Sequence, residues 1–384
     1  PGDELYSVFG HSAVRVVDPE NQLDMVFNYG TFDFDTPNFY LKFIRGKLLY
    51  KLSAYPTHYF ILEYQREGRA IFEQAFNLTT NEKQEVYDFL LENAKPDNAY
   101  YHYDFFYDNC ATRIRDLLDT IIMPSWPDYY VQSPEALDRV RTGFNHEFIY
   151  EPQFNKVRSF RDMLQPFLTN KPWSAFGIDL ALGLPADKIA TPSDFMFLPD
   201  EMLISFAFTG LPDGNPLVYQ NQVMLEKSES LSPAGFFTPV KVFWALFIVS
   251  LLTIWFKKFR IYFDLTYFTL IAITGLLVIF LWFFTDHVAT KTNLNILWTL
   301  PTHLYFIWAY YFSSERYAVK LYFKLVSALS FLIVVFWNFI PQDYNNAFIP
   351  LVIIITYRSF LLGFPEVLSR FTRQKTELNQ NLVT

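Results

Sequence analysis

The 384-residue sequence contains a single cysteine and only 13 glycines. One thiol cannot form an internal bridge, so a disulfide-stabilised scaffold is excluded. Basic side chains are outnumbered by acidic ones, 31 to 39, which argues against a nucleic-acid-binding protein. The sequence has no glycine-rich loop for phosphates, no HExxH and no paired Cys/His spacing. We therefore predict that the protein uses no metal and no other cofactor.

Apolar residues, in contrast, are abundant: they make up 51% of the chain, and aromatic residues alone make up 20%. A disordered chain is poor in aromatic residues and rich in charge, so this class is excluded as well. The charges are unevenly distributed. Residues 1–236 contain 19 basic and 33 acidic side chains, whereas residues 237–384 contain 12 and 6. We predict an aqueous domain at 1–236 and a membrane domain at 237–384.

The membrane domain is predicted from long apolar runs. Residues 237–256 contain one charged side chain, Lys241, and about 20 apolar residues suffice to cross a bilayer as a helix. We predict five transmembrane helices, from this run and from four more at 265–284, 294–312, 321–340 and 346–364.

The loops between these runs predict an orientation. The segments after the first, third and fifth runs are rich in basic residues. The loops at 285–293 and 341–345 contain only one basic residue, Lys291. Basic loops face the cytoplasm, so the C-terminus is expected inside and residues 1–236 outside. Arg358, within the fifth run, is expected to extend toward the cytoplasmic face. An external N-terminal domain needs a leader. None is visible at Pro1, and we expect that residues before it have been removed or are missing.

The first half mixes strand and helix patterns, which predicts a compact α+β domain. Apolar alternation predicts strands, and apolar residues at helical spacing predict helices. The prolines and glycines of 170–235 suggest irregular structure, and 56–65 resembles a loop. The expected strands are 12–17, 25–29 and 69–76, and the expected helices are 80–94, about 109–122, 134–142 and 158–168.

Cys110 is the first candidate for chemistry. It lies in the first turn of an expected helix, with Asp108 or Asn109 as N-cap. The partial positive charge of a helix N-terminus lowers the pKa of a thiol and favours the nucleophilic thiolate. The alternative interpretation is a small side chain buried beneath the helix.

His11 is the candidate base, because a thiol nucleophile needs a base within hydrogen-bonding reach. It follows Gly10, which permits a tight turn just before it. A third group would orient the imidazole. Asn28 on the next strand is the first candidate, followed by Asp33, Asp104 and Asp108. All of these are equally compatible with ordinary structural roles.

A second polar cluster lies in the membrane half, at residues 285–298. Asp286, His287, Asn293 and Asn295 are costly in contact with lipid, so we expect them in a cavity or at the water interface. One interpretation is a substrate groove beneath the outer domain. The other is an ordinary loop anchored by Trp298.

Several long segments resemble one known family, the Lnb-type bacterial lipoprotein N-acyltransferases. The resemblance covers nearly the whole chain. It implies a circularly permuted papain-like (NlpC-like) thiol fold in which His11 precedes Cys110 as base and nucleophile. It leaves the third residue open. The segments are FGHSAVRV, VFNYGTFDF, PNFYLKFIRGKLLYKLS, YYHYDFFYDNCATRIRDLL and GIDLALGLPADK in the first half, and TDHVATKTNLNILWTLPTHL in the second.

The resemblance also implies a reaction and a location. A membrane phospholipid would acylate Cys110, and the α-amine of a diacylated lipoprotein would take the acyl chain from the thioester. Arg113 or Arg115 could meet the phosphate headgroup. The protein would be integral to the bacterial inner membrane, with its N-terminal domain in the periplasm. The alternatives are a membrane-bound thiol hydrolase, acting on phospholipid or cell-wall peptide, and a non-catalytic envelope protein.

Overall fold

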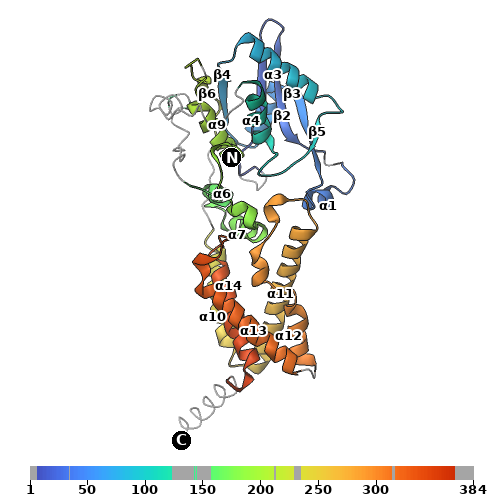
Figure 1. Cartoon of the computed structure of the whole chain (residues 1–384), viewed down its shortest axis with the longest axis vertical. Helices are drawn as coiled ribbons and strands as arrows, with labels where there is room; N and C mark the ends of the chain where they lie inside the picture. The colour runs from blue at the N-terminus through green and yellow to red at the C-terminus, as the bar shows by residue number, and fades with distance from the viewer. Residues whose placement is uncertain are drawn as a thin grey trace. The chain divides into compact units, whose positions relative to one another are not determined.

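The structure is a computed structural model that describes residues 7–33, 35–122, 142, 144, 157–211, 213–228, 235–313 and 316–367 (Figure 1). The chain forms two compact units. The first comprises Pro1–Leu168, Lys188–Pro233 and Thr285–Val288, and the second comprises Thr169–Asp187, Ala234–Phe284 and Ala289–Thr384. Residues 169–187, which composition alone assigned to the aqueous half, are therefore part of the second unit.

The first unit contains a four-stranded antiparallel sheet. Its spatial order is β1 (Val14–Asp18), β2 (Leu23–Thr31), β3 (Leu49–Pro56) and β5 (Tyr100–His102). The two strands predicted near the N-terminus are present. The pairing of β2 with β3 becomes irregular between Asn28 and Thr31. This places a bend in the strand directly after Asn28.

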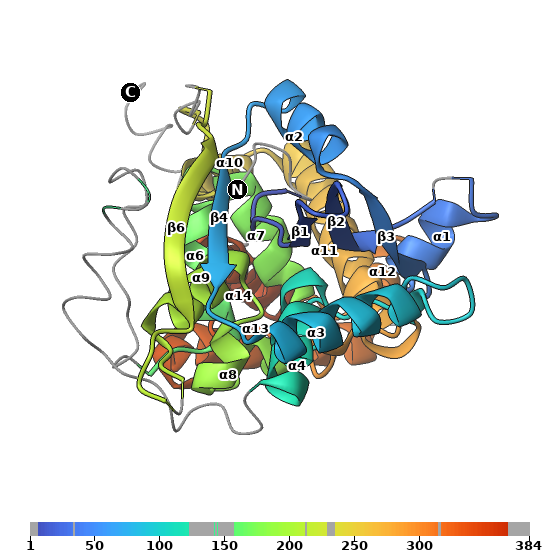
Figure 2. The same ribbon diagram turned by 90° about the horizontal axis from the view of Figure 1, so that it is seen from above.

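Helices pack on this sheet and enclose the core of the unit. They are α2 (Thr57–Arg66), α3 (Thr80–Asn93) and α4 (Cys110–Ile121), whereas α1 (Phe39–Ile44), between β2 and β3 in the chain, has no buried residue. Figure 2 shows α3 and α4 side by side. The apolar face of α4, with Ile114, Leu117 and Leu118, is buried against Phe27 and Tyr29 of β2. Burial of this face, about 25 cal/mol per Å², fixes the helix on the sheet.

The loop predicted at 56–65 is wrong, because α2 occupies this segment. Thr57, Phe60 and Tyr64 are its buried residues, at helical spacing. Pro56 stands directly before the first turn, where a missing N–H costs nothing.

The irregular structure predicted for 170–235 is also wrong. Pro192 and Pro199 stand at the first position of helices, where the fixed φ of proline suits the first turn. The segment contains α7 (Pro172–Ala181), α8 (Pro192–Phe195), α9 (Pro199–Phe208) and β6 (Val218–Leu225). Strand β6 pairs with β4 (Ile71–Phe76) in a second, two-stranded antiparallel sheet. The helix predicted at 158–168 is present as α6 (Phe160–Leu168), and the one at 134–142 lies outside the described residues.

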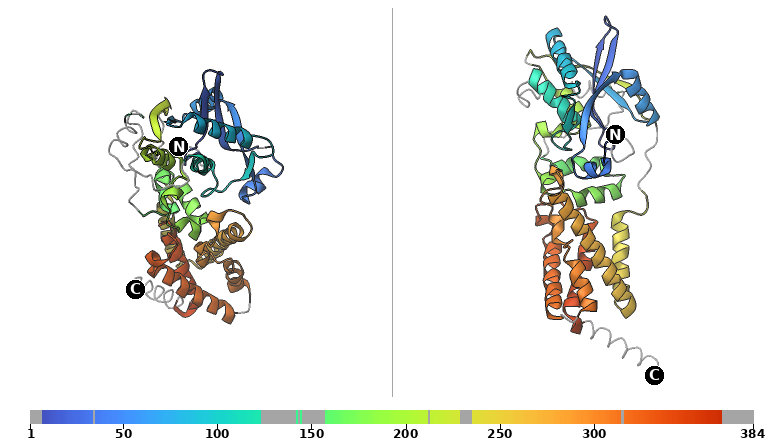
Figure 3. Two further views of the ribbon diagram at one scale, coloured as in Figure 1. Left: turned by 45° about the horizontal axis from the view of Figure 1, so that its top comes forward. Right: turned by 90° about the vertical axis from the view of Figure 1, so that its right-hand side faces the viewer.

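The second unit consists mainly of apolar helices, which form the yellow-to-red bundle in Figure 3. They are α10 (Pro239–Thr253), α11 (Lys257–Phe283), α12 (His303–Phe312), α13 (Arg316–Val335) and α14 (Phe348–Gly363). Among the described helices, Lys257–Phe283 and Tyr317–Val335 are long and apolar enough to cross a membrane. Helices α10 and α14 are apolar but shorter.

The third predicted span, 294–312, is not one helix. It begins with a 3₁₀ turn at Leu294–Leu297, and only His303–Phe312 is α-helical. Pro301 lies between the two, and a proline excludes the residue before it from the α region.

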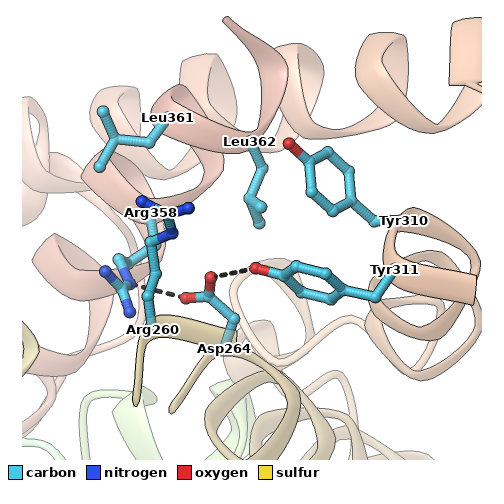
Figure 4. A pocket seen from close by; sticks show the side chains of 7 residues that line it. All are labelled: Arg260, Asp264, Tyr310, Tyr311, Arg358, Leu361 and Leu362. Atoms are coloured by element: carbon cyan, nitrogen blue, oxygen red, sulfur yellow. Dashed lines mark hydrogen bonds and ion pairs between the residues drawn. The ribbon is translucent and has the colours of Figure 1, made fainter. Parts of the chain in front are cut away.

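The side chain of Arg358, for which the sequence allows an extension toward the cytoplasmic face, is instead buried within the second unit. This side chain and that of Asp264 are each 2% exposed, and Nε of Arg358 lies 2.7 Å from Oδ1 of Asp264 (Figure 4). Tyr311 donates to the other carboxylate oxygen at 2.6 Å. Loss of either partner would leave an uncompensated charge in the interior, so each side chain depends on the other.

This ion pair yields a prediction about stability. Arg358→Met leaves the Asp264 carboxylate buried without its cation, and we expect a loss of about 3–5 kcal/mol in the free energy of unfolding. Thermal and denaturant unfolding of the detergent-solubilised protein measures the loss.

The matched control is the double variant Arg358→Met/Asp264→Leu, which removes both charges and should recover most of the lost stability. Equal stability of the single variant and the native protein would show that the pair is not what holds α11 and α14 together.

Candidate active site

Cys110 is the first residue of α4, and Asn109 is the N-cap. The Asn109 carboxamide oxygen accepts from the backbone N–H groups of Ala111 and Thr112, at 2.8 and 3.0 Å. Its amide nitrogen donates to the carbonyl oxygens of Phe105 and Phe197. A buried cap with every hydrogen bond made fixes the start of the helix, and with it the position of the thiol.

His11 precedes β1 and lies beside the thiol. The φ of Gly10 is +84°, so the turn expected just before His11 is present and requires glycine. The thiol and the imidazole interact by charge and through a side-chain hydrogen bond. Nε2 of His11 lies 2.6 Å from Oδ1 of Asn28, which leaves Nδ1 for the thiol.

Asn28 is 7% exposed and belongs to β2. Its amide nitrogen donates to the Tyr55 hydroxyl at 2.8 Å, so the amide is held with its oxygen toward His11. Three side chains from distant parts of the sequence therefore form a thiol–imidazole–carboxamide row.

Gly30 lies next to this row, at the bend in β2, with a φ of +86°. A Cβ placed on Gly30 would lie 3.7 Å from Cβ of Cys110, 3.7 Å from Cε1 of His11 and 3.9 Å from the Tyr101 hydroxyl oxygen. The missing side chain thus leaves space of about one methyl group among these three residues.

Electrostatics favour the charged forms of both reacting groups. Burial lowers the pKa of His11 and raises that of Cys110, because it disfavours charge. The attraction and hydrogen bond between thiolate and imidazolium outweigh burial. The pKa of His11 is therefore raised above its ordinary value, and the pKa of Cys110 is lowered. The Asn28 hydrogen bond adds to the first shift, and the backbone N–H groups of Ser12 and Ala111 add to the second. Arg69 opposes the charge on His11.

The described part of the chain offers no group of three or more His, Cys, Asp and Glu side chains that could hold a metal ion. The arrangement is that of an activated thiol nucleophile with a positioned base.

Comparison with known domain families then identifies the chain. Residues 1–142 match the Lnb N-terminal periplasmic domain, and residues 231–366 match the Lnb transmembrane domain. The chain belongs to the Lnb family. It is an enzyme of the lipoprotein N-acyltransferase type, with a periplasmic N-terminal domain and a transmembrane domain in the inner membrane. Comparisons with curated proteins and with solved structures gave no match.

The Lnb periplasmic match contains the whole thiol–imidazole–carboxamide row, and the two arginines of α4 lie near it. Arg113 makes a bidentate ion pair with Asp108, and its guanidinium lies 4.2 Å from the centroid of the Tyr101 ring. Arg115 is turned away, toward Asp116 and the carbonyl oxygen of Ser193. Of the two, only Arg113 is in contact with a neighbour of the thiol.

The polar residues of 285–298 fall into both units. In the first unit, Asp286 pairs with Lys47 at 3.7 Å, and Nε2 of His287 lies 3.1 Å from the carbonyl oxygen of Ile44. In the second unit, Asn293 and Asn295 are fully buried and donate to carbonyl oxygens of α7. The structure thus uses both asparagines to join segments of the second unit, and substrate binding by these four residues stays a prediction.

Sequence reasoning did not single out Tyr55 or Tyr101. Tyr55 orients Asn28 from β3, and the Tyr101 hydroxyl, from β5, lies 3.9 Å from the point where Gly30 lacks a Cβ. Both occur in aromatic-rich strands, where periodicity alone predicts core.

The pKa shifts predict how the thiol depends on pH. We expect alkylation of Cys110 by iodoacetamide to begin below the ordinary thiol pKa of about 8.5. The thiolate is populated above the lowered pKa of Cys110. The ion pair is lost as pH rises through the raised pKa of His11.

His11→Gln is the informative variant, because it removes the cation but keeps polar volume. The alkylation profile should move to higher pH, since the variant loses the attraction of the imidazolium while burial still raises the pKa of the thiol. An unchanged profile would contradict the pairing of these two residues.

Asn28→Ala tests the orienting residue. The imidazole remains, so we expect a loss in kcat smaller than the roughly 10²–10⁴-fold contribution of a general base, with KM little changed. Tyr55→Phe should reduce kcat in the same direction but less, because the carboxamide stays and loses only its own anchor. Asn28→Ala with native kcat would assign Asn28 to the strand alone.

Proposed function

We propose that this protein transfers an acyl chain from a membrane phospholipid, through a thioester on Cys110, to the N-terminal cysteine of a diacylated lipoprotein. The observation that carries the proposal is the row of Cys110, His11 and Asn28 within a family match to a periplasmic domain. The second family match is to a transmembrane domain. Such a domain holds the enzyme in the membrane that contains both substrates.

In the first half-reaction, the Cys110 thiolate attacks the carbonyl carbon of a phospholipid ester. A carbon–sulfur bond forms, and the carbonyl electron pair moves to oxygen. The tetrahedral intermediate collapses by breaking the bond to the glycerol oxygen. The His11 imidazolium protonates that oxygen, which leaves as the hydroxyl of a lysophospholipid.

In the second half-reaction, the α-amine of the lipoprotein's diacylglyceryl cysteine attacks the thioester. His11, now neutral, accepts a proton from the amine. The carbon–sulfur bond breaks, and the thiolate is restored beside imidazolium. The products are an N-acylated lipoprotein and the resting enzyme, with no redox step and no external reactant.

The finer features belong to the same proposal. The first unit is of the permuted papain-like type, with the histidine strand before the cysteine helix. The transmembrane domain has five spans, the C-terminus lies in the cytoplasm, and Arg113 meets the phosphate of the donor. The bidentate ion pair with Asp108 holds the Arg113 guanidinium in position but partly neutralises its charge.

The test is made in cells depleted of their own N-acyltransferase. The full chain with a secretion leader is expressed there, and mass spectrometry determines the N-terminal cysteine of one lipoprotein. We expect an added N-acyl chain with the native protein and none with Cys110→Ala.

Arg115→Gln serves as the matched control, because Arg115 lies on the same helix and turns away from the thiol. It should retain acylation. Lysophospholipid formation without lipoprotein acylation would instead assign a thiol hydrolase. Acylation that survives Cys110→Ala would exclude the thioester route.

A further inference from the structure

Acyl transfer to a thiol develops a negative charge on the substrate's carbonyl oxygen, and an enzyme stabilises it with hydrogen-bond donors that are already in place. The donor must be close to the nucleophile, and it must be free of any stronger partner.

Tyr101 meets both conditions. Its side chain is 7% exposed, and no hydrogen-bond partner for its hydroxyl lies among the described residues. A buried polar group without a partner costs roughly 1–3 kcal/mol, so a structural role alone does not explain the hydroxyl. Its neighbour Tyr29, by comparison, donates to Asn93 at 2.8 Å.

The position of the hydroxyl fits the reaction. The position that a Cβ on Gly30 would occupy is 3.9 Å from the Tyr101 hydroxyl oxygen. The same position is 3.7 Å from Cβ of Cys110 and 3.7 Å from Cε1 of His11. This space is empty only because residue 30 has no side chain. The carbonyl oxygen of an acyl group bonded to the Cys110 sulfur is about the size of a methyl group and fits this space, on the side of the Tyr101 hydroxyl.

We propose that the Tyr101 hydroxyl donates the hydrogen bond that stabilises the oxyanion of both tetrahedral intermediates. The inference rests on Cys110 being the nucleophile of the proposed function. Tyr101 does not transfer its proton. The hydrogen bond from its O–H to the substrate oxygen shortens as negative charge develops, and lengthens again as the carbonyl re-forms. The backbone N–H of Cys110, at the start of α4, is the natural second donor.

Two features of the surroundings of Tyr101 suit this role. Burial and the nearby thiolate raise the pKa of Tyr101 well above its ordinary value, so the hydroxyl keeps its proton. The Arg113 guanidinium lies 4.2 Å from the ring centroid. A cation over the ring face draws electron density from the phenol and strengthens it as a donor.

The experiment compares two reactions of Cys110 in the purified full chain. Acylation by p-nitrophenyl acetate passes through a tetrahedral oxyanion, whereas alkylation by iodoacetamide is a displacement at a saturated carbon and forms none. In Tyr101→Phe we expect acylation to slow by roughly 10²–10³-fold while alkylation keeps the native rate and pH profile.

Two phenylalanine variants serve as matched controls. Tyr29→Phe removes a hydroxyl from the neighbouring ring, 6.3 Å away between centroids, and should keep the native acylation rate. Tyr64→Phe removes the other buried tyrosine hydroxyl that lacks a partner among the described residues and feels the Cys110 charge. It should also keep the native rate, and a large loss there instead would assign the oxyanion to Tyr64.

The remaining outcomes separate this inference from the proposed function. Native acylation in Tyr101→Phe overturns the inference, and so does an equal loss of acylation and alkylation, which would make Tyr101 a positioning residue for the thiol. If Tyr101→Phe slows only acylation but the native protein acylates no lipoprotein in cells, Tyr101 keeps its role and the acceptor is wrong. A native protein that reacts with neither reagent overturns both.

Discussion

The contact between the Cys110 thiol and the His11 imidazole, each of which favours the charged form of the other, is the interaction on which the candidate site depends. Burial alone would make both Cys110 and His11 neutral, and a neutral thiol is a poor nucleophile. Each charge is stable there because the other is next to it. The surrounding structure therefore has to hold two segments, distant in sequence, at hydrogen-bonding distance. The Asn109 cap fixes the thiol, the Gly10 turn fixes the approach of His11, and the Asn28 carboxamide fixes the ring. The apolar packing of α4 on β2 keeps these elements together.

The sequence predicted the parts of this arrangement that have local causes. A cysteine at a helix start after Asn109, a glycine before His11 and alternation in two N-terminal strands are all local patterns, and the structure contains each of them. Asn28, on the second expected strand, is the first of several candidates for the residue that orients the imidazole. The failures also have a physical reason. Prolines were interpreted as breakers at 170–235, whereas the structure uses Pro192 and Pro199 to begin helices.

Local sequence patterns do not predict contacts between side chains that are distant in sequence. Arg358 looked like a residue that should reach water, because its partner Asp264 is in another helix and only packing brings them together. Tyr101 looked like one more aromatic residue in a Tyr-rich strand. Its hydroxyl becomes notable only when the structure shows a buried donor without a partner beside Cys110 and His11. Such information depends on which atoms are near one another, and the residue types alone do not contain it.

The same pairing explains how one histidine can serve both half-reactions of the proposed mechanism. Before acylation, the thiolate keeps His11 protonated, ready to give its proton to the leaving oxygen. Once the thioester forms, sulfur carries no charge, and the attraction that raised the pKa of His11 is gone. Burial and Arg69 both act to lower that pKa and are then opposed only by the Asn28 hydrogen bond. His11 is therefore held as a neutral base when the incoming amine must lose a proton. Formation of the thioester thus favours the imidazole as a base, and the breaking of the carbon–sulfur bond, which restores the thiolate, favours the imidazolium again.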